Sequence, residues 1–283
     1  MKFTKSHGLG NDFVLIESEE LSGIPPSLLP AFARGICDRH FGVGADGLLI
    51  LSSSPGGHDS IRILNSDGSA AEMCGNGIRC AAHYLMEKRP CRESLLIETP
   101  AGLLECRIKE HSTERAQVAV NMGKPRWDRA QIPMKGLREC VGETLQVDDR
   151  NYEVSCVSMG NPHCVLFLDR DLPEPSVLGP MVEKHPDFPE GANVEFARVL
   201  STSSAEMRVW ERGAGETLAC GTGACAVAVT GIRTGRLFSP VTVHLAGGDL
   251  LIEWSGPASP VWMTGPALLV FSGQADPSLF LKG

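Results

Sequence analysis

Residues Glu72–Ala82 read EMCGNGIRCAA, a cysteine followed at once by Gly-x-Gly and a run of mostly small residues. The second half of the chain repeats this order in Leu218–Ala228, which read LACGTGACAVA. Small and straight-chain residues favour a helix after each cysteine. The chain therefore predicts two equivalent helices, with Cys74 and Cys220 at their starts.

The start of a helix is a favourable place for negative charge. Its first backbone N–H groups have no partner within the helix, and the helix dipole adds partial positive charge there. Both effects favour a cysteine thiolate or a bound carboxylate. A single cysteine of this kind would more often be a buried packing residue. A packing residue has no reason to recur with its glycines, so the repetition favours two reactive sulfurs, each beside an anion-binding site.

The repeat extends upstream of both cysteines. The matched pairs are Asn65 with Glu211, nine residues before Cys74 and Cys220, and Asn11 with Asn161, 63 and 59 residues before them. An internal repeat of this length indicates two similarly folded domains rather than a solenoid. We expect the domains to be related by a pseudo-twofold axis and to meet at a cleft to which each contributes one cysteine.

The remaining sequence predicts more strands than helices. The expected class is α+β, with two pseudo-symmetric domains, each a mainly antiparallel or mixed sheet wrapped around its central helix. Those helices should end near Lys88, where Pro90 follows, and near Arg233. A further helix is expected over residues 26–40, with Ser27 as its cap. The first domain should end near residue 121.

Length, charge and composition restrict the function. The 283 residues are enough for two ordinary domains, and the net charge is −8. No basic run is present, which argues against a nucleic-acid or anionic-membrane partner and favours a small-molecule substrate. No stretch has the length of a signal peptide core or a membrane span, so we expect a cytoplasmic protein.

The chain has ten cysteines. Without a secretion signal they are expected to be free thiols in a reducing compartment. Apart from Cys74 and Cys220, we interpret all of them as packing or surface residues. Those eight are Cys37, Cys80, Cys91, Cys106, Cys140, Cys156, Cys164 and Cys225.

Two opposed thiols suit one type of reaction. Moving a hydrogen from one face of a carbon to the other needs a base on the first side and an acid on the second. A thiol can serve as either, because its ordinary pKa of about 8.5 lies close to neutral. No lysine stands in the cysteine stretches to form a Schiff base, and the glycine-rich run 41–47 lacks a phosphate-loop ending. We therefore expect proton transfer without a cofactor.

Six blocks of the chain together resemble the signature blocks of the diaminopimelate epimerase family. They are residues 7–13 (HGLGNDF), 74–80 (CGNGIRC), 160–163 (GNPH), 191–193 (GAN), 211–213 (ERG) and 220–226 (CGTGACA). The resemblance implies interconversion of LL- and meso-2,6-diaminopimelate in lysine and peptidoglycan-precursor biosynthesis. It also implies a C-terminal strand that returns to the first domain. The expected domains are thus 1–121 with 267–283, and 122–266.

The resemblance also implies roles for individual residues. Cys74 and Cys220 would be the acid and base, in that order for the LL-to-meso direction, with His163 and Glu211 tuning and orienting them. Gly75, Asn76, Gly221 and Thr222 would cradle the reacting amino-acid head. The remaining substrate contacts, with Glu211 beside them, would be Asn11, Asn65, Asn161, Asn193 and Arg212. No metal ligand is implied.

Two positions depart from the family pattern. Gly47 stands where some members have a glutamine that contacts the substrate, so that contact is not expected here. Phe271 stands where some members have a tyrosine at a dimer interface. A ring contact does not need the hydroxyl group, so a homodimer is expected to be possible.

Three other functions compete with this interpretation. A proline or hydroxyproline racemase of the same fold would usually have histidine at Asn76 and would bind a single amino-acid head. A dithiol redox protein would have closely spaced cysteines such as Cys-x-x-Cys, which do not occur here. A zinc module would need cysteine and histidine spacings that the chain lacks.

Overall fold

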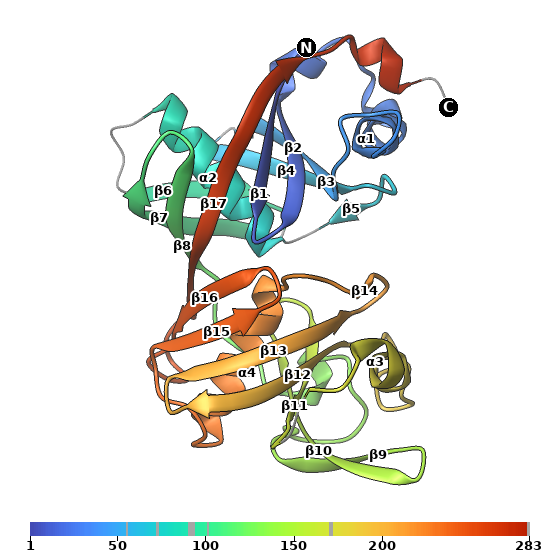
Figure 1. The fold of residues 1–283 in the computed structure, drawn as a ribbon, viewed down its shortest axis with the longest axis vertical. Helices are drawn as coiled ribbons and strands as arrows, with labels where there is room; N and C mark the ends of the chain where they lie inside the picture. The colour runs from blue at the N-terminus through green and yellow to red at the C-terminus, as the bar shows by residue number, and fades with distance from the viewer. Residues whose placement is uncertain (55, 72–73, 90–93, 101, 170–171, 282–283) are drawn as a thin grey trace. The chain divides into compact units, whose positions relative to one another are not determined.

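The computed structural model describes residues 1–54, 56–71, 74–89, 94–100, 102–169 and 172–281. The chain forms two compact units (Figure 1). The first unit comprises Met1–Val120 and Gly265–Gly283, and the second comprises Asn121–Thr264. Pro90, expected to follow the first central helix, lies outside the described residues.

The strands of the first unit close on themselves. They are β1 (Lys2–Gly8), β2 (Asn11–Glu17), β3 (Gly47–Ser53), β4 (Asp59–Asn65), β5 (Ala70–Ala71), β6 (Ser94–Thr99), β7 (Gly102–His111), β8 (Arg115–Asn121) and the later part of β17 (Trp262–Gln274). The pairing order is β17-β1-β2-β3-β4-β6-β7-β8, and β8 pairs with β17 again. The β2–β3 and β4–β6 pairs are parallel, and β1 is antiparallel to both of its neighbours.

The second unit repeats the same series of strand pairings from β10 to β17. Its strands are β9 (Glu143–Val147), β10 (Arg150–Ser158), β11 (Pro162–Phe167), β12 (Asn193–Ser201), β13 (Ser204–Glu211), β14 (Gly215–Glu216), β15 (Val241–Leu245), β16 (Gly248–Glu253) and the start of β17. They pair in the order β9-β10-β11-β12-β13-β15-β16-β17, with β14 added to β13. The β11–β12 and β13–β15 pairs are parallel.

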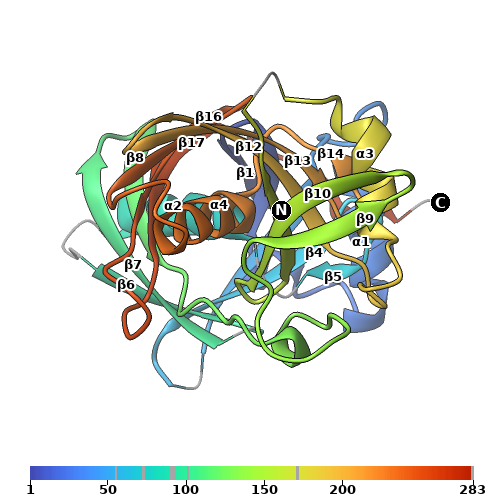
Figure 2. The ribbon, with the colours of Figure 1, turned by 90° about the horizontal axis from the view of Figure 1, so that it is seen from below.

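Each unit wraps its strands around one helix (Figures 1 and 2). Helix α2 (Gly75–Lys88) contacts β1, β2, β3, β4, β6 and β7, and α4 (Gly221–Arg233) contacts β10, β11, β12, β13, β15 and β16. Every residue from Gly221 to Gly231 is buried, which explains why this helix is apolar or small on all sides. The predicted α+β class and the bounds of both central helices are confirmed.

The other helices lie outside the sheets. Helix α1 (Leu29–Cys37) packs on β3 and β4, and α3 (Pro175–Glu183) packs on β12 and β13. Short 3₁₀ helices are η1 (Ser18–Leu21), η2 (Pro26–Leu28), η3 (Arg129–Gln131) and η4 (Pro277–Phe280). Phe280 of η4 packs edge to face on Phe32 of α1, with ring centroids 5.8 Å apart.

The prediction that Ser27 caps a helix over residues 26–40 is wrong. Residues Pro26–Leu28 form a separate 3₁₀ turn, and α1 begins after Leu28, with no side-chain cap at either start. Proline occupies the first turn of both segments and brings no N–H group. Because fewer donors need a partner there, the sequence does not require Ser27 to act as a cap.

Candidate active site

Cys74 begins helix α2. Its backbone is extended, and its Sγ accepts a hydrogen bond from the N–H of Gly77 at 3.4 Å. The Gly77 position is crowded, because a Cβ atom there would lie 3.2 Å from Cδ2 of Leu49 and 3.6 Å from the ring of Phe13. The glycine thus allows the helix start and its sulfur to approach strands β2 and β3.

Asn11 contacts the Cys74 sulfur. Its Oδ1 lies 3.6 Å from Sγ of Cys74 and accepts from Nδ2 of Asn76 at 3.2 Å. Its Nδ2 donates to a carboxylate oxygen of Asp46 at 2.9 Å. An ionised carboxylate can only accept, so Asp46 fixes which end of the Asn11 amide faces the sulfur. The Cys74 thiol is therefore the donor to Asn11, an arrangement that favours its protonated form.

Asp46 belongs to a cluster of charged side chains with Asp12, Arg39 and Lys5. Arg39 bridges the carboxylates of Asp12 and Asp46 at 2.8 and 2.6 Å, and Lys5 pairs with Asp12 at 2.7 Å. Burial alone would raise the pKa of Asp12, but hydrogen bonds from Arg39 and Lys5 hold it well below its usual range. The cluster keeps the Asp12 carboxylate ionised, and the Arg39 bridge holds Asp46 where it orients Asn11.

Arg79 is a residue of the site that the sequence analysis did not identify. Its side chain is fully buried within α2 and donates to Oδ1 of Asn76 at 2.8 Å, to the carbonyl of Gly75 at 3.3 Å and to the carbonyl of Pro266 at 3.2 Å. Arg79 therefore positions the amide of Asn76. An arginine in a helix of small residues is a signal that could have found it.

Cys220 begins helix α4 in the same way. Its Sγ accepts from the N–H of Gly223 at 3.4 Å and lies 3.5 Å from Oγ1 of Thr222. Thr222 Oγ1 in turn accepts from Nδ2 of Asn161 at 3.3 Å. Because that oxygen accepts from Asn161, the proton of the Thr222 hydroxyl group is available to Cys220. Burial is the largest influence on the pKa of Cys220 and raises it, whereas the hydrogen bonds from Thr222 and Gly223 lower it.

A buried pair of side chains lies behind Asn161. His163 Nε2 is 2.8 Å from Asn161 Oδ1, and His163 Nδ1 is 2.7 Å from Oε1 of Glu195. The side chains of both His163 and Glu195 are fully buried. The sequence analysis singled out His163 but not Glu195. Glu195 is a single acidic residue between two apolar strand residues, Val194 and Phe196, and the sequence analysis did not use this signal.

Glu211 lies close to the second cysteine. It is half-buried at the end of β13 and accepts a hydrogen bond from the Thr217 hydroxyl group. Burial raises the pKa of Glu211, against hydrogen bonds from Thr217 and Cys220 that lower it. Burial, together with the charges of Glu211 and Glu195, also raises the pKa of Cys220 well above its ordinary value. Both groups therefore hold protons more strongly than they would in water.

The amide groups at the two helix starts are arranged alike. The first bonds within the helices are made by the N–H groups of Ile78 and Ala224, which donate to the carbonyls of Cys74 and Cys220. The backbone N–H groups of Gly75 and Gly221 precede these bonds and lie beside the sulfurs. Each unit therefore has the local geometry for holding a carboxylate next to a thiol.

The three remaining candidate residues have different environments. Asn65 is exposed at the end of β4 and donates to Ser69 Oγ at 2.9 Å. The Asn193 amide is buried, donating to the Pro162 carbonyl at 2.8 Å and accepting from the Arg212 N–H at 2.9 Å. The Arg212 guanidinium donates to the carbonyl of Glu190 at 3.1 Å. The fold already uses the Asn193 amide, to hold the segments around residues 162 and 212.

The other described cysteines are buried. Cys80 and Cys225 are fully buried, as expected of core residues. Burial raises the pKa of Cys37, Cys80 and Cys106 to about 12. Cys140, Cys156 and Cys164 are buried as well, and Cys91 lies outside the described residues.

One group of side chains has the composition of a metal site. His83, Glu87 and His111 place one ligand atom each within 4.8 Å of one another, and no other such group occurs within the described ranges. His111 pairs with Glu87 at 2.6 Å and His83 Nε2 lies 3.1 Å from the carbonyl of Ser112, whereas His83 Nδ1 is buried without a hydrogen-bond partner among the described residues. None of them is a predicted site residue.

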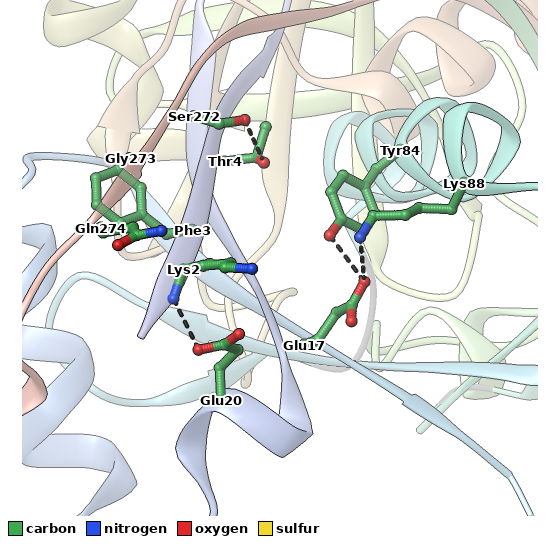
Figure 3. A pocket seen from close by; sticks show the side chains of 10 residues that line it. All are labelled: Lys2, Phe3, Thr4, Glu17, Glu20, Tyr84, Lys88, Ser272, Gly273 and Gln274. Atoms are coloured by element: carbon green, nitrogen blue, oxygen red, sulfur yellow. Dashed lines mark hydrogen bonds and ion pairs between the residues drawn. The ribbon is translucent and has the colours of Figure 1, made fainter.

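A pocket of about 350 Å³ lies in the first unit (Figure 3). Its lining includes Glu17, Tyr84 and Lys88, and the Glu17 carboxylate accepts from Tyr84 at 2.8 Å and pairs with Lys88 at 3.2 Å. These charges neutralise one another, and the lining contains none of the predicted site residues. The pocket is therefore separate from the cysteine at the other end of α2.

Comparison with known proteins shows the family to which the chain belongs. The family profile of diaminopimelate epimerase matches residues 3–127 and 155–270. The diaminopimelate epimerase of Moorella thermoacetica is 51% identical over 277 residues, which cover 97% of this chain and 99% of that protein. The diaminopimelate epimerase of Pelotomaculum thermopropionicum is 49% identical over 277 residues, covering 97% and 98%.

More distant structures share the fold. A hydroxyproline epimerase from Agrobacterium vitis superposes with a TM-score of 0.68 at 15% identity, covering 97% of this chain and 90% of that one. A methylitaconate-delta-isomerase superposes with a TM-score of 0.65 at 12% identity, covering 100% and 97%. At such low identity these two likenesses concern the fold alone. The sequence relatives and the matched profile show that the chain belongs to the diaminopimelate epimerase family.

Proposed function

We propose that the chain epimerises LL-2,6-diaminopimelate to meso-2,6-diaminopimelate, as an isomerase of lysine and peptidoglycan-precursor biosynthesis. The observation that carries the proposal is the pair of helices, each begun by a cysteine whose sulfur contacts the helix's own N–H group. One thiol donates to an asparagine oxygen, whereas the other sulfur accepts from a hydroxyl group. Two similar sulfurs in opposite hydrogen-bond settings suit an acid and a base.

The proposed reaction begins at Cys220. Its proton passes to Glu211, whose raised pKa makes it a better proton acceptor than an exposed carboxylate. The Cys220 thiolate, held by Thr222 and the N–H of Gly223, removes the α-hydrogen of the substrate. The Cys74 thiol then gives its proton to the opposite face of the same carbon. The substrate ends with inverted configuration, and the reverse reaction starts from Cys74.

The helix starts would stabilise the intermediate charge. As the α-hydrogen leaves, negative charge spreads onto the α-carboxylate, which hydrogen-bond donors fixed in advance stabilise. We assign this cradle to Gly75, Asn76, Gly221 and Thr222. We assign recognition of the rest of the substrate to Asn11, Asn65, Asn161, Asn193, Glu211 and Arg212. An arginine fork suits the carboxylate of the amino-acid head that does not react.

Separate measurement of two steps tests the proposal. In Cys74→Ala, removal of the α-hydrogen should continue through Cys220, so deuterium from heavy water should still enter LL-diaminopimelate, while meso product falls by at least about 10³-fold. Cys220→Ala should lose exchange from the LL isomer. Epimerisation at the parent rate in either variant, or a need for an electron acceptor or a metal ion, would contradict the two-thiol mechanism.

The expected division into domains, 1–121 with 267–283 and 122–266, is part of this proposal. Each domain would supply one sulfur to the same substrate carbon. A thermal or proteolytic study of the whole enzyme with and without a substrate analogue would test it, because a ligand held by both domains should protect both.

A homodimer is also proposed, on the evidence of the late part of β17. Val270 and Phe271 are 55% and 51% exposed there, and Phe271 packs edge to face on Phe3 at 6.2 Å. Sedimentation of the protein and of Phe271→Glu would test whether this surface associates, since a buried charge would weaken the dimer.

We also propose that the protein works in a reducing compartment such as the cytoplasm. The mechanism requires both cysteines as free thiols, which such a compartment maintains. No helix among the described residues is long and apolar enough to span a membrane. Full activity of the enzyme only with an added thiol reductant would support the proposal.

A further inference from the structure

The two units place different residues behind their cysteines. The β2–β3 pair aligns Phe13 with Gly47, and the β11–β12 pair aligns His163 with Asn193, both in parallel register. Phe13 and His163 each stand two residues after the matched asparagine, Asn11 or Asn161. The corresponding strand positions therefore hold an aromatic ring in one unit and an imidazole in the other.

The next inward-facing position differs in the same way. Two residues after Gly47 and Asn193, the strands carry Leu49 and Glu195. A Cβ atom on Gly77 would lie 3.2 Å from Leu49 Cδ2, and one on Gly223 would lie 2.8 Å from Glu195 Oε1. Leu49 and Glu195 thus occupy the same place against the first turn of their helices. The first unit has an apolar pair there, and the second has a histidine–glutamate pair.

Packing does not account for the polar pair. Burying a carboxyl group and an imidazole is costly even when they bond to each other, and an apolar pair of similar volume is often as stable. The first unit shows that phenylalanine and leucine fit this architecture. In addition, Oε2 of Glu195 is buried without a hydrogen-bond partner among the described residues. A pair retained at such a cost calls for a role other than stability.

The His163–Glu195 pair begins a chain of hydrogen bonds in which each donor points toward Cys220. Because His163 Nε2 faces the oxygen of the Asn161 amide, Nε2 must carry a hydrogen. Asn161 then donates through Nδ2 to Thr222 Oγ1, which leaves the hydroxyl proton of Thr222 for Cys220. Glu195 Oε1, 2.7 Å from the other ring nitrogen, holds the ring in the orientation that presents Nε2 to Asn161. At Cys74 the direction is opposite, because Asp46 turns the Asn11 oxygen toward the thiol.

We propose that Glu195 is a positioning residue for Cys220. Together with His163 it locks the amide of Asn161, so that Thr222 donates to the Cys220 sulfur and supports its thiolate. The pair makes the second sulfur the base in a duplicated fold whose first unit has phenylalanine and leucine instead. The inference deepens the proposed function and rests on it for the meaning of the thiolate. The hydrogen-bond chain itself can be tested without turnover.

The test measures the pH dependence of alkylation at Cys220. The variant is His163→Phe with Glu195→Leu, which gives the second unit the pair found in the first. Iodoacetamide labelling at pH 6–11 is followed at each cysteine peptide by mass spectrometry, with Cys74 as the internal control. Groups facing Cys220 are Glu211 on β13, Glu195 on β12, and Thr222 and Gly223 on α4, with His163 on β11 reaching it through Glu195 and Asn161.

Thr222→Val removes the hydroxyl donor and should raise the Cys220 midpoint by about one pH unit in the parent, a tenfold loss of thiolate below the midpoint. The midpoint for Cys74 should not move. The double variant disrupts the same donation but also removes the Glu195 charge, which raises the pKa of Cys220 in the parent, so its own shift combines two opposite effects. Thr222→Val should add nothing further in the double variant, because the donation is already lost there.

Glu195→Gln is the second variant, for use if the double variant does not fold. Its amide can present either end to His163, so the direction of the chain is no longer fixed. In this background Thr222→Val should raise the Cys220 midpoint by less than it does in the parent. The proposal is overturned if Thr222→Val leaves the Cys220 midpoint of the folded parent unmoved, if it shifts Cys74 equally, or if its effect is the same in the parent and in the variant backgrounds. If these shifts occur but neither cysteine variant loses epimerisation, the chain stands and the proposed mechanism fails.

Discussion

At the scale of single residues, the thiol of Cys220 and the carboxyl of Glu211 hold protons in the same neighbourhood. Burial raises the pKa of both groups. Since both shifts have the same sign, the raised pKa of Glu211 offsets part of the rise in the pKa of Cys220. Proton transfer from Cys220 to Glu211 is therefore less costly than the Cys220 shift alone would suggest.

Glu211→Gln should separate the catalytic role of this carboxyl from its effect on stability. A carboxyl with a raised folded-state pKa gives its stabilising contribution at pH values below its ordinary pKa of about 4.5, and loses it as pH rises through the raised value. At pH 7 the ionised Glu211 is thus a cost that glutamine removes. We expect the variant to be at least as stable as the parent at pH 7, with an advantage that shrinks toward pH 5.

The rate should change in the opposite sense. Without an acceptor for the Cys220 proton, kcat for the LL-to-meso direction should fall by about 10²–10³-fold. Thermal unfolding from pH 5 to pH 8 and initial rates on the same samples check both parts. A variant that loses stability and activity together at pH 7 would show that Glu211 is structural.

Residues of the repeated blocks were easier to predict as site candidates than the residues that orient them. Cys74, Cys220, Asn11, Asn161 and His163 stand in repeated blocks, and the structure brings them together within each unit as expected from their spacing. Their assignment as catalytic or binding residues remains a prediction. The residues that orient them are Asp46, Arg79 and Glu195. A charged residue in a strand or helix looks the same in sequence whether it faces solvent or a buried amide.

At the scale of elements, the two central helices depend on glycine at the third helical position. Gly77 and Gly223 both donate their N–H groups to a cysteine sulfur, and both face a strand pair. A helix enclosed by strands cannot move outward to make room for a larger residue. The sequence signal was strong here, because small residues on every side of a helix indicate enclosure.

Alanine at the two glycines should have unequal effects. In Gly223→Ala the new methyl group would lie 2.8 Å from Glu195 Oε1 and 3.3 Å from the Cys220 sulfur, all buried. We expect about 1–3 kcal/mol of destabilisation from such overpacking, and at least about a tenfold loss of activity as the sulfur shifts. In Gly77→Ala the nearest atom is the flexible end of Leu49, at 3.2 Å.

The Gly77→Ala variant is therefore the matched control, with an expected destabilisation below about 1 kcal/mol. Denaturant unfolding and epimerisation rates of both variants measure the difference. Equal losses at the two positions would mean that the polar pair behind α4 is no more restrictive than the apolar pair behind α2.

At the scale of the whole molecule, the first unit is assembled from both ends of the chain. Residues 265–274 of β17 lie between β1 and β8, and Phe280 packs on Phe32 of α1. The expectation of a returning C-terminal strand came from the family resemblance. Local pattern could not give it, because the run 268–271 reads as a strand whichever sheet it joins.

Fragments should show this dependence. A fragment of residues 1–120 should not fold alone, since β1 and β8 lose the strand between them and α1 loses Phe280. A fragment of residues 121–264 should fold, because its contacts are contained within it. Circular dichroism and amide exchange would check both fragments, and a synthetic peptide of residues 265–283 should restore structure to the first. A well-folded 1–120 fragment without the peptide would contradict the expectation.

The shared strand also sets an order on biosynthesis. During translation the amino-terminal half emerges from the ribosome long before the strand that completes its barrel, whereas the middle of the chain has all of its own partners once residue 264 is out. The middle of the chain should therefore fold before the amino-terminal part does. Helix α2, which is synthesised first, would lack its complete sheet and stay accessible to chaperones until synthesis is nearly finished.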